Sequence, residues 1–168
     1  MAESIVAWIT GIFGVSIGKL IGVLFISIIP IIELRGAIPV AFAIGISWQT
    51  AMICSIIGNL LPIPFILLFL DYVFKFMKEH NIFKNLVLKM EEKAQKGSKK
   101  VEKYKFLGLL IFVAIPLPGT GGWTGALIAS VMKMNKKHAF LSISGGVIIA
   151  GIIVTLLTYG LVGSVIRG

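Results

Sequence analysis

The stretch A-I-P-L-P-G-T-G-G-W-T, residues 114–124, lies at the centre of an apolar segment and decides the fold. Residues 106–132 carry no charge and are flanked by lysines on both sides. A helix crosses a bilayer in ~20 residues, but prolines and glycines interrupt the centre of this segment. The positive-inside rule places both basic flanks in the cytoplasm. We therefore predict a re-entrant hairpin of two half-helices, 106–115 and 123–132, with its broken tip near mid-membrane.

Composition places the chain among integral membrane proteins. Of its 168 residues, 57% are hydrophobic and 14% are charged, and the mean hydropathy is +1.00, values typical of that class. The net charge is +9, and ten of the sixteen basic residues are lysines within 75–105. Lysines gathered beside apolar segments indicate membrane topology and contact with anionic lipid headgroups, and argue against nucleic-acid binding. Because Cys54 is the single cysteine, no disulfide or cysteine-based metal site is expected, and no cofactor either.

The first half of the chain shows a similar succession of elements. Glu33 and Arg35 interrupt a long apolar segment, which then continues without a charge to residue 70. A single helix over that continuation would measure ~52 Å, more than a ~30 Å hydrocarbon core, so the chain must turn. We predict half-helices at 20–29 and 36–46 and a full crossing at 50–70. The predicted first tip is marked by Pro30, Gly36 and Pro39, and the second by Pro116 and Pro118.

Two such units in opposite orientations would form an inverted repeat, the plan of many secondary transporters, whose substrate site lies at the midplane. The predicted fold is an all-α integral membrane protein in which each unit is a re-entrant helical hairpin plus a transmembrane helix. The single domain, 1–168, is expected to comprise an interfacial helix (1–18), a first repeat (19–74), a linker (75–105) and a second, inverted repeat (106–168). A short span is the alternative for residues 4–18. The linker has the pattern of an amphipathic cytoplasmic helix.

The last predicted crossing, 139–165, carries the C-terminus to the outside. The expected location is the plasma membrane of a prokaryote, which the chain crosses several times. Glycines 145, 146, 151 and 160 of this crossing indicate close helix contact, such as the seam of a homodimer.

Three motifs carry a family resemblance: E-L-R-G-A-I-P-V-A (33–41), I-G-N-L-L-P (57–62) and I-P-L-P-G-T-G-G-W-T-G-A (115–126). They resemble the family named "putative small multi-drug export protein", which is similar to the DedA/VTT superfamily of membrane proteins. The resemblance covers residues 20–165. It implies two oppositely oriented re-entrant hairpins and the translocation of lipids or amphiphiles, namely polyprenyl-phosphate carriers in DedA-like members and phospholipids in VTT relatives.

One departure from the DedA-like pattern concerns the second tip. DedA-like second hairpins carry an arginine just after the proline–glycine turn, whereas Thr120 and Gly121 occupy that region here. Arg35 is therefore the one arginine inside the predicted membrane region, which makes it the candidate phosphate-binding residue.

Glu33 and Arg35 are the candidate chemical groups, because an ionisable residue inside a membrane is expensive and usually functional. Arg35 would hold a phosphate through paired donors. Glu33 would take up and release a proton to drive exchange, since a low-dielectric surrounding favours the neutral acid. The alternative is a neutralised ion pair that caps backbone groups at the tip, or a pair at the membrane interface.

The second tip offers backbone groups, because a half-helix starting near Gly122 directs its positive dipole end toward mid-membrane and suits an anionic headgroup. A bare turn that needs glycine for close packing is the alternative. Trp123 could stack on substrate or fill space, and Asn59 could bond substrate or a neighbouring helix. The candidate substrate-binding residues are Glu33, Arg35, Asn59, Gly119, Thr120, Gly121, Gly122 and Trp123.

Three function classes follow from these features. The first is translocation of an amphiphilic, phosphate-bearing lipid through a site between the two hairpins. The second is proton-coupled export of small amphiphilic drugs, for which Glu33 would be the required acid. The third is a non-transporting membrane organiser, in which neither Glu33 nor Arg35 would matter. An enzyme is not expected, since the sequence offers no nucleophile–base set, metal cluster or nucleotide loop.

The predicted topology can be tested by cysteine accessibility on a Cys54→Ser background. Cysteines at Gly97 and Asn135 should label from the cytoplasm, and those at Gln49 and Gly168 from outside, because lysines flank residues 106–132 on both sides. Labelling of positions 97 and 135 from opposite faces would contradict the second hairpin.

Overall fold

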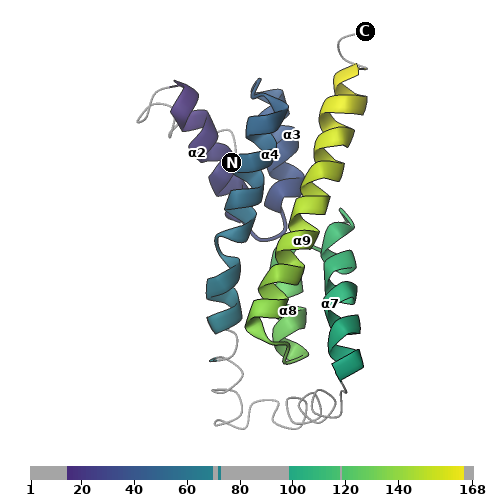
Figure 1. Ribbon diagram of the computed structural model, residues 1–168. Coiled ribbons are helices and arrows are strands. Elements are labelled where there is room, and N and C mark those ends of the chain that lie inside the picture. The colour runs from purple at the N-terminus through teal and green to yellow at the C-terminus, as the bar shows by residue number, and fades with distance from the viewer. Residues whose placement is uncertain (1–14, 70–71, 73–98, 118, 165–168) are drawn as a thin grey trace. The chain divides into compact units, whose positions relative to one another are not determined.

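The computed structural model describes residues 15–69, 72, 99–117 and 119–164, and this part of the chain folds into helices and short turns without a strand (Figure 1). These residues belong to two compact units. One is drawn from residues 1–62 together with 147–168, and the other from residues 63–146. The all-helical prediction is therefore confirmed for the described residues.

The first unit contains α2 (Val15–Ile28), α3 (Glu33–Ala43), α4 (Trp48–Leu60), the second part of α9 (Lys136–Thr155) and the π-helix η1 (Leu156–Val162). Apolar residues of α2, α3 and α4 form its core, which includes Val23, Ile26, Ala37, Ala41 and Ala51. The helix α4 approaches α2 at a glycine, because a Cβ added at Gly58 would lie 2.6 Å from the carbonyl oxygen of Leu24. The hydroxyl of Ser27 donates to the carbonyl of Ser55 at the same contact.

The first break, residues 29–32, is shorter than predicted. The returning helix begins at Glu33 and not at residue 36, so Gly36 and Pro39 lie inside α3 and not in the tip. The physical reason is the backbone at Ile31, whose φ of 78° reverses the chain before the glycine is reached. Pro39 is tolerated in α3, although it cannot donate the hydrogen bond that the carbonyl of Arg35 would accept in a regular helix.

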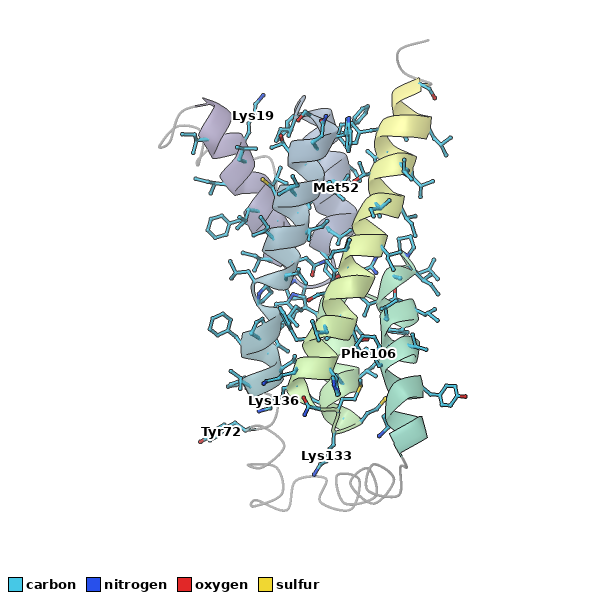
Figure 2. All side chains as sticks on the ribbon, viewed as in Figure 1. Lys19, Met52, Tyr72, Phe106, Lys133 and Lys136 are labelled. Carbon is cyan, nitrogen blue, oxygen red and sulfur yellow. The ribbon has the colours of Figure 1, made fainter. Side chains whose placement is uncertain are left out.

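The second unit contains α7 (Lys99–Ala114), α8 (Gly122–Val131) and the first part of α9. Here α9 approaches α7 at Gly146, where an added Cβ would lie 2.7 Å from the carbonyl oxygen of Leu110. The hydroxyl of Ser142 donates to the carbonyl of Phe106 at 2.6 Å. Figure 2 labels Phe106 on α7. The helix limits agree with the predicted half-helices 106–115 and 123–132, except that α7 begins earlier.

Two helices are long and apolar enough to cross a membrane, namely Trp48–Phe69 with 22 residues and Lys136–Val162 with 27 residues. They coincide with the crossings predicted at 50–70 and 139–165. The orientation of the hairpins and the inverted repeat remain predictions. Most of the predicted interfacial helix 1–18 and of the linker 75–105 lies outside the described residues.

The two close glycine contacts predict a specific pattern of stability. Gly58→Ala and Gly146→Ala should each lower the free energy of unfolding by about 1–3 kcal/mol, because the methyl group would overlap a main-chain carbonyl. Gly108→Ala is the matched control, since no atom lies within 4 Å of an added Cβ there. Denaturant unfolding in detergent would measure the three differences. Equal effects at all three positions would contradict the packing.

Candidate functional site

The break between α2 and α3 has an unusual backbone. Ile31 has φ of 78° and Glu33 has φ of 50°, a left-handed conformation in which side chains other than glycine are unfavourable. The chain is nevertheless held by main-chain hydrogen bonds, from Glu33 N–H to Ile29 O at 3.1 Å and from Gly36 N–H to Ile32 O at 3.0 Å. Such residues cost about 1–3 kcal/mol each and gather at functional sites. The positive φ angles of Ile31 and Glu33 therefore make the break a candidate functional site, before its side chains are considered.

Glu33, which is buried, and Arg35, which is half-buried, form an ion pair at this break. Arg35 Nη1 lies 2.6 Å from Glu33 Oε2, and the side chains are 14% and 4% exposed. Residues two apart do not face each other on a regular helix, but Glu33 begins α3 in the left-handed conformation. The broken tip thus brings the two charges together. The result is the ion pair that the sequence analysis gave as the alternative to a transport role. The pair is neutral as a whole, which reduces the penalty of burying either charge alone.

Asn59 supplies a second buried polar group of the first unit. It lies on α4, whereas Glu33 begins α3, and the two antiparallel helices contribute to one core cluster (Figure 1). Glu33 and Asn59 are 3% and 1% exposed as whole residues.

The amide of Asn59 has an unsatisfied hydrogen-bonding capacity. Within the described part of the chain, neither its Oδ1 nor its Nδ2 has a partner, and the same holds for Ser55 Oγ. Ser55 and Asn59 are four residues apart and share one face of α4. An unpaired buried polar group costs ~1–3 kcal/mol and requires an explanation. A bound polar group of a substrate, or water that exchanges with it, would satisfy the amide.

The second break, residues 115–121, is organised by Thr120. Its hydroxyl oxygen lies 2.6 Å from Ile115 O and 2.8 Å from Leu117 O, and it accepts the N–H of Leu117 at 3.3 Å. Gly119 takes φ of 84°, which favours glycine. Pro116 lies in the break as predicted, and Pro118 falls outside the described residues. The hydroxyl of Thr120 therefore holds the backbone of the break.

The helix α8 begins at Gly122, as the sequence analysis predicted, and its N-cap Gly121 provides no side-chain cap. Gly121 and Gly122 are buried and Trp123 is half-buried. Residues 119–123 thus lie at or beside the N-terminus of α8, where backbone N–H groups carry partial positive charge. Whether this end and the Glu33–Arg35 pair form one pocket concerns both units and stays a prediction.

Ser27 and Ser55 were not expected at this site from the sequence; they are buried and packed against each other. Part of this arrangement could be read from the sequence, since Ser55 and Asn59 are polar residues four apart in the apolar part of α4 that follows Thr50. Among the described residues, no group of three or more His, Cys, Asp and Glu side chains could hold a metal ion.

Two helices are long and apolar enough to cross a membrane, and an ion pair lies at the break between α2 and α3; these features favour a helical membrane protein. Residues 33–153 match the family described as "Putative small multi-drug export protein". The chain belongs to this family. The description concerns export and is consistent with a non-enzymatic role, and it fits the drug-exporter alternative better than lipid translocation. No curated protein and no solved structure matches the chain.

Asn59 gives a prediction that separates function from stability. Asn59→Leu should raise the free energy of unfolding by about 1–3 kcal/mol, because an unpaired buried amide is replaced by an apolar group of similar size. The same variant should reduce transport if the amide contacts substrate. Denaturant unfolding and a liposome assay would measure the two effects. Ser142→Ala is the contrast, since it removes a paired hydroxyl and should lower stability. A destabilised Asn59→Leu would show that the amide has a partner.

Proposed function

We propose that the protein is a membrane transporter that exports amphiphilic molecules, and that the charged part of the substrate binds at the Glu33–Arg35 pair. The observation that carries this proposal is the ion pair at a strained helix break, 2.6 Å between its charged atoms. Ionisable groups inside a membrane protein mark substrate or proton pathways. The family description supports export.

The chemistry of the pair suggests an exchange of partners. Arg35 offers five N–H donors in a planar fork, and its Nη1 is occupied by Glu33. An anionic headgroup that displaces Glu33 would form two parallel hydrogen bonds with the guanidinium. The released carboxylate would then be neutralised by a proton, because a buried unpaired charge is unfavourable. Substrate binding and proton uptake would thus be linked at one pair of residues.

A phosphate-bearing lipid is the substrate class that this exchange fits first. Phosphate oxygens would accept the paired hydrogen bonds of Arg35, and the buried amide of Asn59 in the same unit would add one further donor group. The resemblance to the DedA/VTT superfamily supports the same substrate class. In the second unit, the backbone N–H groups at the N-terminus of α8 would also suit an anionic headgroup.

Export of cationic amphiphilic drugs is the second candidate, and the family description favours it. Glu33 would then be the residue that binds the substrate, and a drug cation would replace Arg35 as its partner. The two candidates differ in which member of the pair contacts the substrate. Substitution of each member therefore distinguishes them.

The test is transport by the reconstituted protein in liposomes, with a fluorescent phosphate-bearing lipid and a cationic dye measured in parallel. Arg35→Ala should reduce lipid transport more than tenfold, and Arg35→Lys should recover only part of it, because an ammonium lacks the planar fork. Glu33→Gln should flatten the dependence of transport on pH, since it removes the titrating group. For a cation exporter, Glu33→Gln should abolish dye transport.

The matched control for charge is Lys137→Gln, because this lysine is exposed at the start of α9. The folded fraction of each variant should be measured alongside, so that lost transport is not confused with lost protein. Folded Arg35→Ala and Glu33→Gln variants that both transport normally would contradict the proposal and favour the membrane organiser.

A further inference from the structure

We propose that the unit formed by residues 63–146 binds an anionic phospholipid in the groove between α7 and α8, separately from the Glu33–Arg35 site. The groove has a volume of about 430 Å³. Its lining includes Tyr104, Lys105, Gly108, Phe112, Ile128 and Met132. All but Lys105 and the hydroxyl of Tyr104 present apolar surface, so the groove combines a long apolar part with one cationic group.

The cationic group is located at one end of the groove. Lys105 is part-buried, and its Nζ donates to the carbonyl of Met132, the C-cap of α8, at 3.5 Å. In the first unit Lys19 makes a tighter contact of this kind, 2.9 Å from its Nζ to the carbonyl of Ile44, the C-cap of α3. An ammonium group has three donors. The long bond of Lys105 therefore leaves donor capacity for an anion.

Other positive charges lie at the same end of this unit. Figure 2 labels Lys133 and Lys136, which follow α8 and begin α9 at the end where α7 starts. A phosphate at Lys105 would therefore lie in a positive field. Basic pockets between membrane helices at the cytoplasmic side bind anionic headgroups.

The apolar part of the groove fits an acyl chain. Gly108 lies one turn from Lys105 and Phe112 one turn further, so these three residues span ~10 Å along α7. An added Cβ at Gly108 would meet no atom within 4 Å, which shows that the glycine leaves open space in the groove. A free phosphate would use only Lys105, whereas a phospholipid would use both the charge and the apolar surface. We therefore commit to a phospholipid with an anionic head.

The experiment measures binding of phosphatidylglycerol to the full-length protein in detergent by native mass spectrometry, with phosphatidylcholine and glycerol phosphate as parallel ligands. Phosphatidylglycerol should bind in preference to both. Lys105→Gln should weaken it about fivefold, the equivalent of ~1 kcal/mol. Gly108→Leu should weaken it tenfold or more by filling the groove, whereas Gly108→Ala should have a smaller effect.

Three controls make the result decisive. Gly160→Leu adds the same side chain at another open helical position, and Lys137→Gln removes an exposed lysine of the same unit. Both should bind phosphatidylglycerol as the unmodified chain does. The losses caused by Lys105→Gln and Gly108→Leu should be the same on an Arg35→Ala background, which separates this groove from the Glu33–Arg35 site. Equal losses for Lys137→Gln and Lys105→Gln, equal binding of glycerol phosphate, or unchanged binding by folded Gly108→Leu would each overturn the proposal.

Discussion

A helix that ends inside an apolar surrounding leaves N–H and C=O groups that lipid cannot satisfy, and each unit of this protein depends on how that constraint is met. In both units a long helix packs against the short helix that precedes the break. Gly58 and Gly146 allow the backbones to touch, and the hydroxyls of Ser27 and Ser142 bond carbonyls across the contact. In each unit the long helix therefore packs against the short helix that ends at the break, where the regular main-chain hydrogen bonds of that short helix stop.

The two breaks meet the constraint with different chemistry. At the first break, Glu33 adopts a left-handed backbone and its carboxylate binds Arg35. At the second break, Thr120 bonds the carbonyls of the turn and Gly119 takes the positive φ. A threonine hydroxyl keeps its hydrogen bonds at any physiological pH, whereas an acid–base pair changes when a proton or a competing ion arrives. The first break is therefore the part of the described chain suited to switching.

The sequence predicted the positions of both breaks, because the length of the apolar segments and their prolines required a turn. It did not predict where the first break ends. Gly36 and Pro39 are the residues expected to interrupt a helix, but the positive φ values fall on Ile31 and Glu33, which no propensity rule would select. The burial of Asn59 without a partner among the described residues was also out of reach, since it depends on how the helices pack. Local sequence encodes the limits of a helix better than it encodes how two helices pack against each other.

The polar groups of the first unit argue against a purely structural reading of the pair. A cap for a broken helix needs hydrogen-bond acceptors and donors, and an ion pair supplies them. It does not need the amide of Asn59, which is buried in the same unit without a partner among the described residues. An apolar residue there would give a more stable unit, because a buried unpaired amide is unfavourable while leucine is not. An unpaired amide that is retained in the same unit as this ion pair agrees with the proposal of a polar ligand at the first break.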